Sequence, residues 1–298
     1  MIYHEPVLLK ESIDGLNIKP DGMYADVTFG GGGHSIEILK RLEKGKLIGF
    51  DQDEDALINA IDDERFVMVN ANFRFLKNFL KYHKAIPTDG ILADLGVSTH
   101  QIDDPERGFS SRFDTALDLR MDRKSEMNAA DVLNTYTTEQ LSKMFFKYGE
   151  LRQAKRIAEA LEEYRKIKKF NNVSDLKEAI GRYAERGKEN KFYAKVFQAL
   201  RIEINNELEA LKELLLQSKE VLNEGGRLVV ISYHSLEDRL VKNFMKSGNF
   251  EGIIEKDFYG KEISPFTVVT RKPLIAGNDE VIRNNRSRSA KLRIAIKK

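Results

Sequence analysis

Four consecutive glycines stand at 30–33, inside the segment DVTFGGGGHS that runs from Asp26 to Ser35. Glycine loses more conformational freedom on folding than any other residue, so a run of four needs a physical reason. Between a strand and a helix, such a run lets a ligand reach backbone N–H groups at the helix N-terminus, where the helix dipole favours negative charge. The run therefore predicts a site for a ligand with an anionic or strongly polar end.

Asp51 ends the apolar segment KLIGFD, about twenty residues beyond the glycines, where a carboxylate can accept hydrogen bonds from both hydroxyls of a ribose. An NAD site is disfavoured because Ser35 stands where the G-x-G-x-x-G pattern needs its third Gly or Ala. A P-loop is disfavoured because His34 and Ser35 replace its Gly-Lys-Ser/Thr. S-adenosylmethionine, which has a carboxylate and a ribose but no pyrophosphate, fits a short glycine turn plus Asp51. The alternative is that the glycines only permit a tight crossover and Asp51 is an ordinary acid at a strand end.

Strand-like and helix-like patterns alternate around these residues. Strand patterns occupy 23–29, 46–51, 65–72 and 88–96, and helical patterns occupy 34–43, 53–61 and 72–83. This alternation predicts an α/β fold with a parallel sheet that carries helices on both faces. Ligands bind such sheets at the carboxyl ends of the strands, where the glycine turn, Asp51 and Asp94 are expected to lie.

The alternation stops after Gly96, and the chain then carries only helical patterns, at 137–167, 174–186 and 191–222. It resumes with a strand at 228–231, a helix at 235–247 and two strand candidates at 265–270 and 291–298. We therefore expect a core formed by residues 1–103 and 201–298, with an all-helical insertion at 104–200. An insertion placed directly after the strand that ends in Asp94 is well sited to recognise a substrate.

The composition excludes several kinds of chemistry. The chain has 298 residues and no cysteine, which rules out disulfides, thiolate metal sites and cysteine nucleophiles. No cluster of His, Asp and Glu stands at the spacing of metal ligands. The sequence has neither an apolar run of the ~18 residues that span a bilayer nor a signal-peptide pattern, so a cytoplasmic protein without membrane contact is expected.

The end of the chain is basic. Residues 283–298, RNNRSRSAKLRIAIKK, contain no acidic residue, although the whole chain has a formal net charge of only +2. Such a segment makes a polyanion a candidate partner. The simpler alternative is a solvated terminal strand with its flanking loop.

Several long segments of the chain are similar, in order, to those of one bacterial family: HEPVLLKE, DVTFGGGGHS, ADLGVSTHQIDDPERGFS, LDLRMD, FQALRIEINNEL, RLVVISYHSLEDRLVK and RSRSAKLRIA. The chain resembles the RsmH family, formerly called MraW, from His4 to Ala295. Members of that family methylate the exocyclic amine of a decoding-site cytidine in small-subunit (16S) ribosomal RNA, with S-adenosylmethionine as methyl donor. The resemblance implies a class I (Rossmann-like) methyltransferase fold with a helical insertion.

The resemblance also implies functional residues. The cofactor contacts of the family correspond to Gly32, Gly33, His34, Asp51, Phe73, Asp94 and Gln101. The implied partner is small-subunit ribosomal RNA, either free or in the assembled subunit, and a homodimer stays open. The segment DLGV, which begins at Asp94, replaces the Pro-Pro-aromatic motif of many amino-methyltransferases, so another group must hold the base.

A cytosine amine is a poor nucleophile because its lone pair is delocalised into the ring, so positioning carries most of its methylation. Asp94 is the best candidate to hold the cofactor and the amine in line, and Ser98 is a second acceptor. His234, with Tyr233 beside it, is expected either to contact an extruded base or to orient the following helix, with Ser235 as its N-cap. Both interpretations of His234 stay open.

On the RNA side, the residues expected to meet phosphates are Arg286, Arg288, Lys291 and Arg293. Two other classes of function compete: a methyltransferase for DNA or a small molecule, and a non-catalytic RNA-binding protein that keeps the cofactor pocket. The missing Pro-Pro-aromatic motif argues against DNA amines, and the basic end of the chain argues against most small molecules. The retained Gly32, Gly33 and Asp51 argue against a loss of catalysis.

Overall fold

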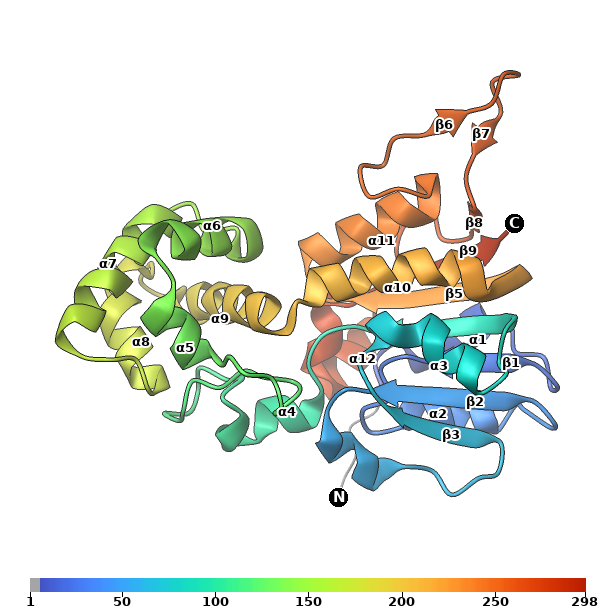
Figure 1. Cartoon of the computed structure of the whole chain (residues 1–298), viewed down its shortest axis with the longest axis horizontal. Coiled ribbons are helices and arrows are strands. Elements are labelled where there is room, and N and C mark those ends of the chain that lie inside the picture. Colours follow the sequence, from blue (N-terminus) through green and yellow to red (C-terminus); the bar gives the residue numbers. More distant parts are fainter. Residues whose placement is uncertain (1–5) are drawn as a thin grey trace. The chain divides into compact units, whose positions relative to one another are not determined.

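A computed structural model describes residues 6–298 of the chain (Figure 1); His4 and Glu5, which begin the HEPVLLKE segment, lie outside this range. Within the described range, seven strands form one sheet in the order β3-β2-β1-β4-β5-β9-β8. Their bounds are β1 Met23–Asp26, β2 Lys46–Asp51, β3 Phe66–Asn70, β4 Thr88–Asp94, β5 Leu222–Ser232, β8 Phe266–Val268 and β9 Lys291–Lys297. Strands β1 to β5 pair in parallel, which confirms the expected α/β fold, and β9 and β8 join as antiparallel strands.

The sheet buries both of its faces. Successive residues of a strand point to opposite faces, so Ala25 packs in one core and its neighbour Tyr24 in the other. Side chains of α3 (Leu76–Tyr82), α10 (Glu207–Val221) and α11 (Ser235–Ser247) fill the first core, and α10 and α11 lie alongside β5 in Figure 1. Side chains of α1 (Leu9–Leu16) and α2 (Gly33–Leu39) fill the second core. Burial on both sides explains why the parallel strands read as continuous apolar runs.

Three neighbouring strands end on an aspartate. Asp26 ends β1, Asp51 ends β2 and Asp94 ends β4. Because β1 pairs in parallel with both β2 and β4, the three carboxylates stand at the same edge of the sheet. This carboxyl edge is where doubly wound sheets bind their ligands.

Residues 97–207 form a second compact unit, and the sheet belongs to the first, which comprises the residues up to Gly96 and from Leu208 onward. The helices of the second unit are α4 Thr99–Asp103, α5 Ala129–Thr135, α6 Thr138–Gly149, α7 Ala154–Ile167, α8 Val173–Ile180 and α9 Glu189–Asn205. They enclose a hydrophobic core of their own, onto which Val97 and Ile204 pack. These two contacts explain why the unit extends beyond the periodicity-based bounds of 104–200 at both ends.

Some helical patterns form other structures than expected. The pattern at 137–167 is two helices, because Glu150 after α6 adopts a left-handed φ of 48°. The pattern at 191–222 is likewise divided between α9 and α10 at Asn206, whose φ is 50°. A left-handed residue interrupts the hydrogen bonding of an α-helix. The pattern at 53–61 forms a short 3₁₀ helix, Glu54–Asn59.

Smaller elements complete the fold. A hairpin of β6 (Glu255–Lys256) and β7 (Glu262–Ile263) extends away from the sheet, and α12 (Asn278–Arg283) precedes β9 (Figure 1). The remaining 3₁₀ helices are Phe73–Phe75, Pro105–Arg107, Gly181–Tyr183 and Asn285–Ser289. In the part of the chain that the structure describes, every helix is too short or too polar to cross a bilayer.

Candidate active site

The glycine turn joins β1 to α2, which begins at Gly33. Gly32 has a φ of 75°, in the left-handed region that other residues rarely adopt. At Gly33, a Cβ atom would lie 2.2 Å from Cγ of Pro6, so the N-terminal segment approaches this position too closely for any side chain. Backbone conformation at one position and close packing at the next thus explain two of the four glycines.

His34 is buried in the first turn of α2, where only 6% of its surface is exposed. Its Nε2 lies 3.2 Å from the carbonyl oxygen of Val7, to which the ring can donate a hydrogen bond. Burial lowers the pKa of His34 to about 4, so the ring is neutral at pH 7. The ring therefore ties the N-terminal segment to the glycine turn. A ligand contact at this position falls to the backbone N–H, because the first N–H groups of a helix have no intrahelical partner.

Asp51 braces the glycine turn. Its Oδ2 accepts a hydrogen bond from the backbone N–H of Gly30 at 2.8 Å, and its Oδ1 accepts one from the N–H of Asp53 at 2.9 Å. Burial raises the pKa of Asp51 to about 6, although these two hydrogen bonds act to lower it. Each carboxylate oxygen can accept a further bond, so Asp51 can hold the turn and still receive ribose hydroxyls.

Asp26 and Thr28, which the sequence analysis did not single out, connect the turn to Asp94. Asp26 is buried and accepts hydrogen bonds from Oγ of Ser35 at 2.7 Å and from the N–H of Thr28 at 3.2 Å. Oγ1 of Thr28 in turn accepts the backbone N–H of Asp94 at 2.6 Å. Burial raises the pKa of Asp26 to about 6. The sequence signal for these two residues is that they are the polar side chains of the DVTF segment, which directly precedes the four glycines.

Asp94 is half-buried at the end of β4. Its Oδ1 accepts a hydrogen bond from the hydroxyl of Tyr233 at 2.7 Å. Burial raises the pKa of Asp94 to about 7, the Tyr233 hydrogen bond acts in the opposite direction, and the charges of Asp26 and Glu237 raise it further. Among residues 6–298, Asp94 forms no ion pair. It is therefore a carboxylate whose charge the fold itself leaves uncompensated.

His234 is the N-cap of α11. Its Nδ1 accepts the backbone N–H of Glu237 at 3.4 Å, and the Glu237 carboxylate accepts the N–H groups of Tyr233 at 2.9 Å and His234 at 3.4 Å. The cap is thus His234 itself, and the expectation that Ser235 would be the N-cap is wrong. These contacts favour a helix-orienting role for His234, while a contact with an extruded base stays a prediction.

Ser98 and Gln101 belong to the helical unit, where they form the N-terminal capping box of α4. Oγ of Ser98 accepts the N–H of Gln101 at 3.1 Å, and Oε1 of Gln101 accepts the N–H of Ser98 at 3.0 Å. Gln101 is buried, with 4% of its surface exposed. Both side chains thus have a structural partner, and their roles in cofactor or amine binding stay predictions.

Phe73 stands at the carboxyl edge, three residues after β3, and opens a 3₁₀ helix capped by Asn72. Oδ1 of Asn72 accepts the N–H of Arg74 at 2.9 Å, which fixes the turn. The ring of Phe73 is half-buried and packs against the core that α3, α10 and α11 cover. Its role as a cofactor contact stays a prediction.

The four predicted phosphate contacts differ in their surroundings. Arg293 is 6% exposed, and its Nε donates to Oδ1 of Asp238 at 2.6 Å. Nζ of Lys291 donates to the other oxygen of Asp238 at 3.3 Å. Arg286 is half-buried and Arg288 is exposed. Lys291 and Arg293 thus share a carboxylate partner inside the fold, and Arg288 is the most accessible of the set.

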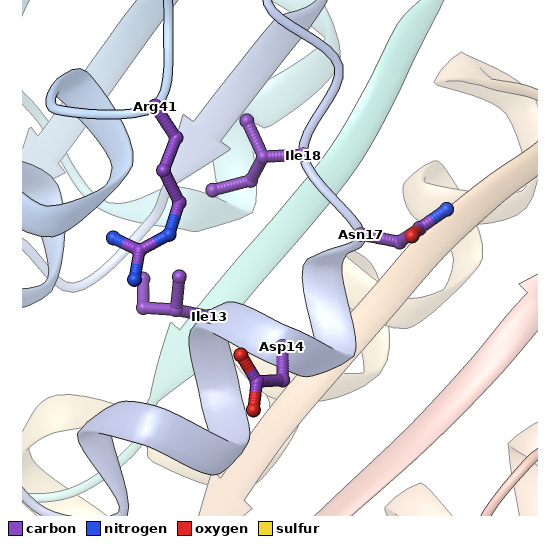
Figure 2. Close-up of a pocket in the computed structure, with 5 residues that line it drawn as sticks. All are labelled: Ile13, Asp14, Asn17, Ile18 and Arg41. Carbon is purple, nitrogen blue, oxygen red and sulfur yellow. The ribbon is translucent and has the colours of Figure 1, made fainter.

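A hollow of about 450 Å³ is lined by Ile13, Asp14, Asn17, Ile18 and Arg41, whose side chains Figure 2 shows. It lies between α1 and the segment that follows α2, before the amino end of β1. Its two charged groups already have partners, because Asp14 binds Lys10 and Arg41 binds Glu37. Because its lining residues precede β1 or follow α2, the hollow lies at the opposite end of the strands from the glycine turn and the three aspartates.

Comparisons with known proteins agree along the whole chain. A family model described as the MraW methylase family matches residues 1–298. The ribosomal RNA small subunit methyltransferase H of Phocaeicola vulgatus is 56% identical over 298 residues, which cover 100% of this chain and 98% of that protein. The protein of the same name from Cytophaga hutchinsonii is 57% identical over 296 residues, with 99% of each chain covered.

Solved structures share less with the chain. An rRNA methylase from Streptococcus thermophilus has a TM-score of 0.44 and 13% identity, with 100% of this chain and 98% of that chain covered. SMU.1697c from Streptococcus mutans, solved in complex with SAH, has a TM-score of 0.42 and 16% identity, with 100% of both chains covered.

Proposed function

The chain belongs to the MraW methylase family, and from this membership we propose that it methylates the exocyclic amine of a cytidine in the decoding region of 16S ribosomal RNA. Membership makes it an S-adenosylmethionine-dependent methyltransferase of small-subunit ribosomal RNA. The target position and the roles of single residues are the proposed part. With this substrate, we expect the protein to work in the cytoplasm, where small ribosomal subunits are assembled.

The carboxyl edge of the sheet supports the proposal through its uncompensated negative charge. Asp26, Asp51 and Asp94 end three neighbouring strands, and none of them has an ion-pair partner in the described part of the chain. Buried carboxylates are normally paired with cations, so this edge suits a ligand that brings positive charge. S-adenosylmethionine carries a positive sulfonium and an amino group, and the residues present therefore fit it.

The residues of the edge divide the work of cofactor binding. The first-turn N–H groups of α2 receive the polar end of the cofactor, because they lack carbonyl partners and lie at the positive end of the helix dipole. Asp51 receives the ribose hydroxyls, and Phe73 offers its ring to the cofactor. Gln101, which belongs to the helical unit, stays a predicted cofactor contact. The hydrogen bond that the N–H of Gly30 donates to Asp51 keeps the turn in place for these contacts.

Asp94 aligns the acceptor. S-adenosylmethionine supplies the methyl group, which leaves the sulfur as the new bond to nitrogen forms. Oδ2 of Asp94 accepts a hydrogen bond from the cytidine amine and so directs the nitrogen lone pair toward the methyl group. The nitrogen must lose one proton after transfer, and a carboxylate whose pKa is about 7 can accept that proton at Oδ2. Ser98 is the second acceptor that we propose.

RNA binding is assigned to two parts of the chain. The helical unit, residues 97–207, follows directly on the strand that ends in Asp94 and is proposed to recognise the substrate. The exposed Arg288, together with Arg286, is proposed to contact phosphates near the carboxyl edge, since both follow α12 in the segment before β9.

The test is to map methyl transfer. Purified protein and labelled S-adenosylmethionine are incubated with free small-subunit ribosomal RNA, assembled small subunits, DNA or a metabolite pool, and the modified nucleoside is located by mass spectrometry. We expect N4-methylcytidine in the decoding region, with the much slower Asp94→Asn as the matched control. Methylation only of DNA or of a small molecule would contradict the proposal, and cofactor binding without any transfer would favour the non-catalytic alternative.

A further inference from the structure

The hydroxyl of Tyr233 is committed to a carboxylate. It donates to Oδ1 of Asp94 at 2.7 Å, a short distance typical of a hydrogen bond to a charged acceptor. Oδ2 of the same carboxylate has no hydrogen-bond partner among the residues that the structure describes. We propose that Tyr233 is a positioning residue that fixes the carboxylate of Asp94 through Oδ1 and leaves Oδ2 to the substrate amine. This inference rests on the proposed function, because it assigns Tyr233 to the same reaction.

Both ends of this hydrogen bond are themselves held in place. Tyr233 directly follows β5, and its backbone N–H donates to Oε2 of Glu237 at 2.9 Å. Glu237 is only 3% exposed and belongs to the capping box of α11, so it cannot move without disturbing the helix start. On the other side, the backbone N–H of Asp94 donates to Oγ1 of Thr28 at 2.6 Å. Two neighbouring strands and a helix thus set the distance between the hydroxyl and the carboxylate.

The charges around the pair explain what the hydroxyl does. Burial, together with the negative charge of Asp94, raises the pKa of Tyr233 well above its usual value, so the hydroxyl keeps its proton and acts as a donor. The negative charges of Asp26 and Glu237 raise the pKa of Asp94, while the positive charge of Arg286 acts on the pKa of Tyr233 in the lowering direction. The donated hydrogen bond favours the ionised form of Asp94 against burial and these two acids. Tyr233 therefore both orients Asp94 and keeps it able to accept a proton.

Tyr233→Phe removes one oxygen and keeps the ring, so it tests the hydroxyl with little change in packing. The measurement is kcat/KM for S-adenosylmethionine across pH at saturating RNA, which reports groups of the enzyme before the cofactor binds. We expect kcat/KM at pH 7 to fall about tenfold to hundredfold, the scale for losing a hydrogen bond to a charged group. The acid limb of the profile should move to higher pH, because Asp94 loses the donor that lowers its pKa. RNA affinity should stay at the wild-type value.

Tyr136→Phe is the matched control. The hydroxyl of Tyr136 also donates to a carboxylate, Oε1 of Glu203 at 2.9 Å, but within the helical unit. This variant should leave the acid limb where it is in the wild type. A shift of similar size in both variants would overturn the inference, because the effect would not depend on the Asp94 pair.

A double-mutant cycle separates positioning from an independent role. If Tyr233 acts through Asp94, Tyr233→Phe should add almost nothing to the defect of Asp94→Asn. Additive defects would overturn the inference, and so would an unchanged acid limb. A loss of RNA affinity with wild-type kcat would also overturn it and would indicate that Tyr233 stacks on the base. The pH dependence of cofactor affinity, measured by calorimetry without RNA, should show the same shift in Tyr233→Phe. That measurement tests Tyr233 even if the wild-type protein fails to methylate the RNA, which would overturn the proposed function instead.

Discussion

Strand β4 carries an aspartate near each end, and the two carboxylates have opposite surroundings. At the amino end, Asp89 binds Nζ of Lys19 at 2.8 Å, the N–H of Met23 at 3.0 Å and Nδ2 of Asn223 at 2.9 Å. Burial alone would raise the pKa of Asp89, but these hydrogen bonds outweigh it and hold the pKa below its usual value. At the carboxyl end, burial raises the pKa of Asp94 to about 7. The same strand thus keeps one carboxylate satisfied by the fold and one that needs a ligand.

The same contrast between paired and unpaired carboxylates is found at other strands, along both edges of the sheet. At the carboxyl edge, burial raises the pKa values of Asp26 and Asp51 to about 6. Near the amino end of β3, Asp63 forms an ion pair with Arg65, which lowers the pKa of Asp63 to about 2. Paired carboxylates stabilise the folded state, whereas buried unpaired ones destabilise it at neutral pH. We infer that the carboxyl edge gives up stability to hold negative charge for the cofactor and the amine.

The largest expected effect is on the rate of methyl transfer. Asp94→Asn keeps the shape of the side chain but removes its charge, so turnover should fall roughly a hundredfold, equivalent to a lost transition-state contact of ~3 kcal/mol. RNA affinity should stay nearly intact. Single-turnover kinetics at saturating cofactor checks this, with circular dichroism as the control for folding. A wild-type rate would remove Asp94 from the reaction and move the search to Ser98 and His234.

Asp51→Ala should weaken S-adenosylmethionine binding by ~1 to 3 kcal/mol, the scale for losing hydrogen bonds to a charged group. Isothermal titration calorimetry measures the change. Asp63→Ala is the matched control, because it removes a paired carboxylate that we place outside the site. If Asp51→Ala folds and binds the cofactor with wild-type affinity, Asp51 has no ribose role.

Asp89→Asn should lower the stability of the fold, whereas Asp94→Asn should not. The folded-state pKa of Asp89 is lowered, so its stabilisation is present above its unfolded-state pKa of about 4 and is lost as pH falls through the folded value. Asp89→Asn should therefore reduce the free energy of unfolding at pH 7 by about 1 to 2 kcal/mol. The pKa of Asp94 is raised, so the folded state loses stability as pH rises through about 7, and Asp94→Asn should not be less stable than the wild type at pH 8. Thermal melts across pH measure the stability change in both variants. An Asp94→Asn protein less stable than the wild type at pH 8 would contradict the proposed difference between the two aspartates.

The smallest expected effect comes from comparing an exposed cation, Arg288, with a buried one, Arg293. Arg288→Ala should lower the slope of RNA affinity against salt concentration by roughly one unit, because each phosphate contact releases about one counterion. Arg293→Ala should instead reduce thermal stability, since Arg293 is buried against Asp238. Filter binding across salt concentrations measures the first effect. Equal salt slopes for Arg288→Ala and the wild type would make the basic end of the chain structural.

Local patterns were sufficient to predict much of the fold. Alternating periodicities placed the glycine turn after a strand and put Asp51 and Asp94 at strand ends, which is where the structure has them. These features depend on neighbours within a few residues. Even so, the break at Glu150 was not visible in the sequence, because glutamate rarely adopts the left-handed conformation that ends α6.

Contacts between distant segments could not be predicted in this way. The hydrogen bond from Tyr233 to Asp94 joins residues 139 positions apart, and it depends on the register of β4 against β5. The pairing of Lys291 and Arg293 with Asp238 likewise depends on β9 entering the sheet beside β5. Sequence alone gave these cations the same role as Arg288, because net charge does not reveal a partner in the fold.

Proton release on cofactor binding tests the central claim most directly. If Asp94 and Asp51 are held unpaired for the cofactor, binding of a cation lowers their pKa values and releases protons at pH 6.5, near the values of about 7 and about 6 in the free protein. Calorimetry in buffers of different ionisation enthalpy counts these protons. We predict net release with S-adenosylmethionine, less with S-adenosylhomocysteine, whose sulfur is neutral, and less in Asp94→Asn. The same number of protons for both ligands and for both proteins would contradict the account.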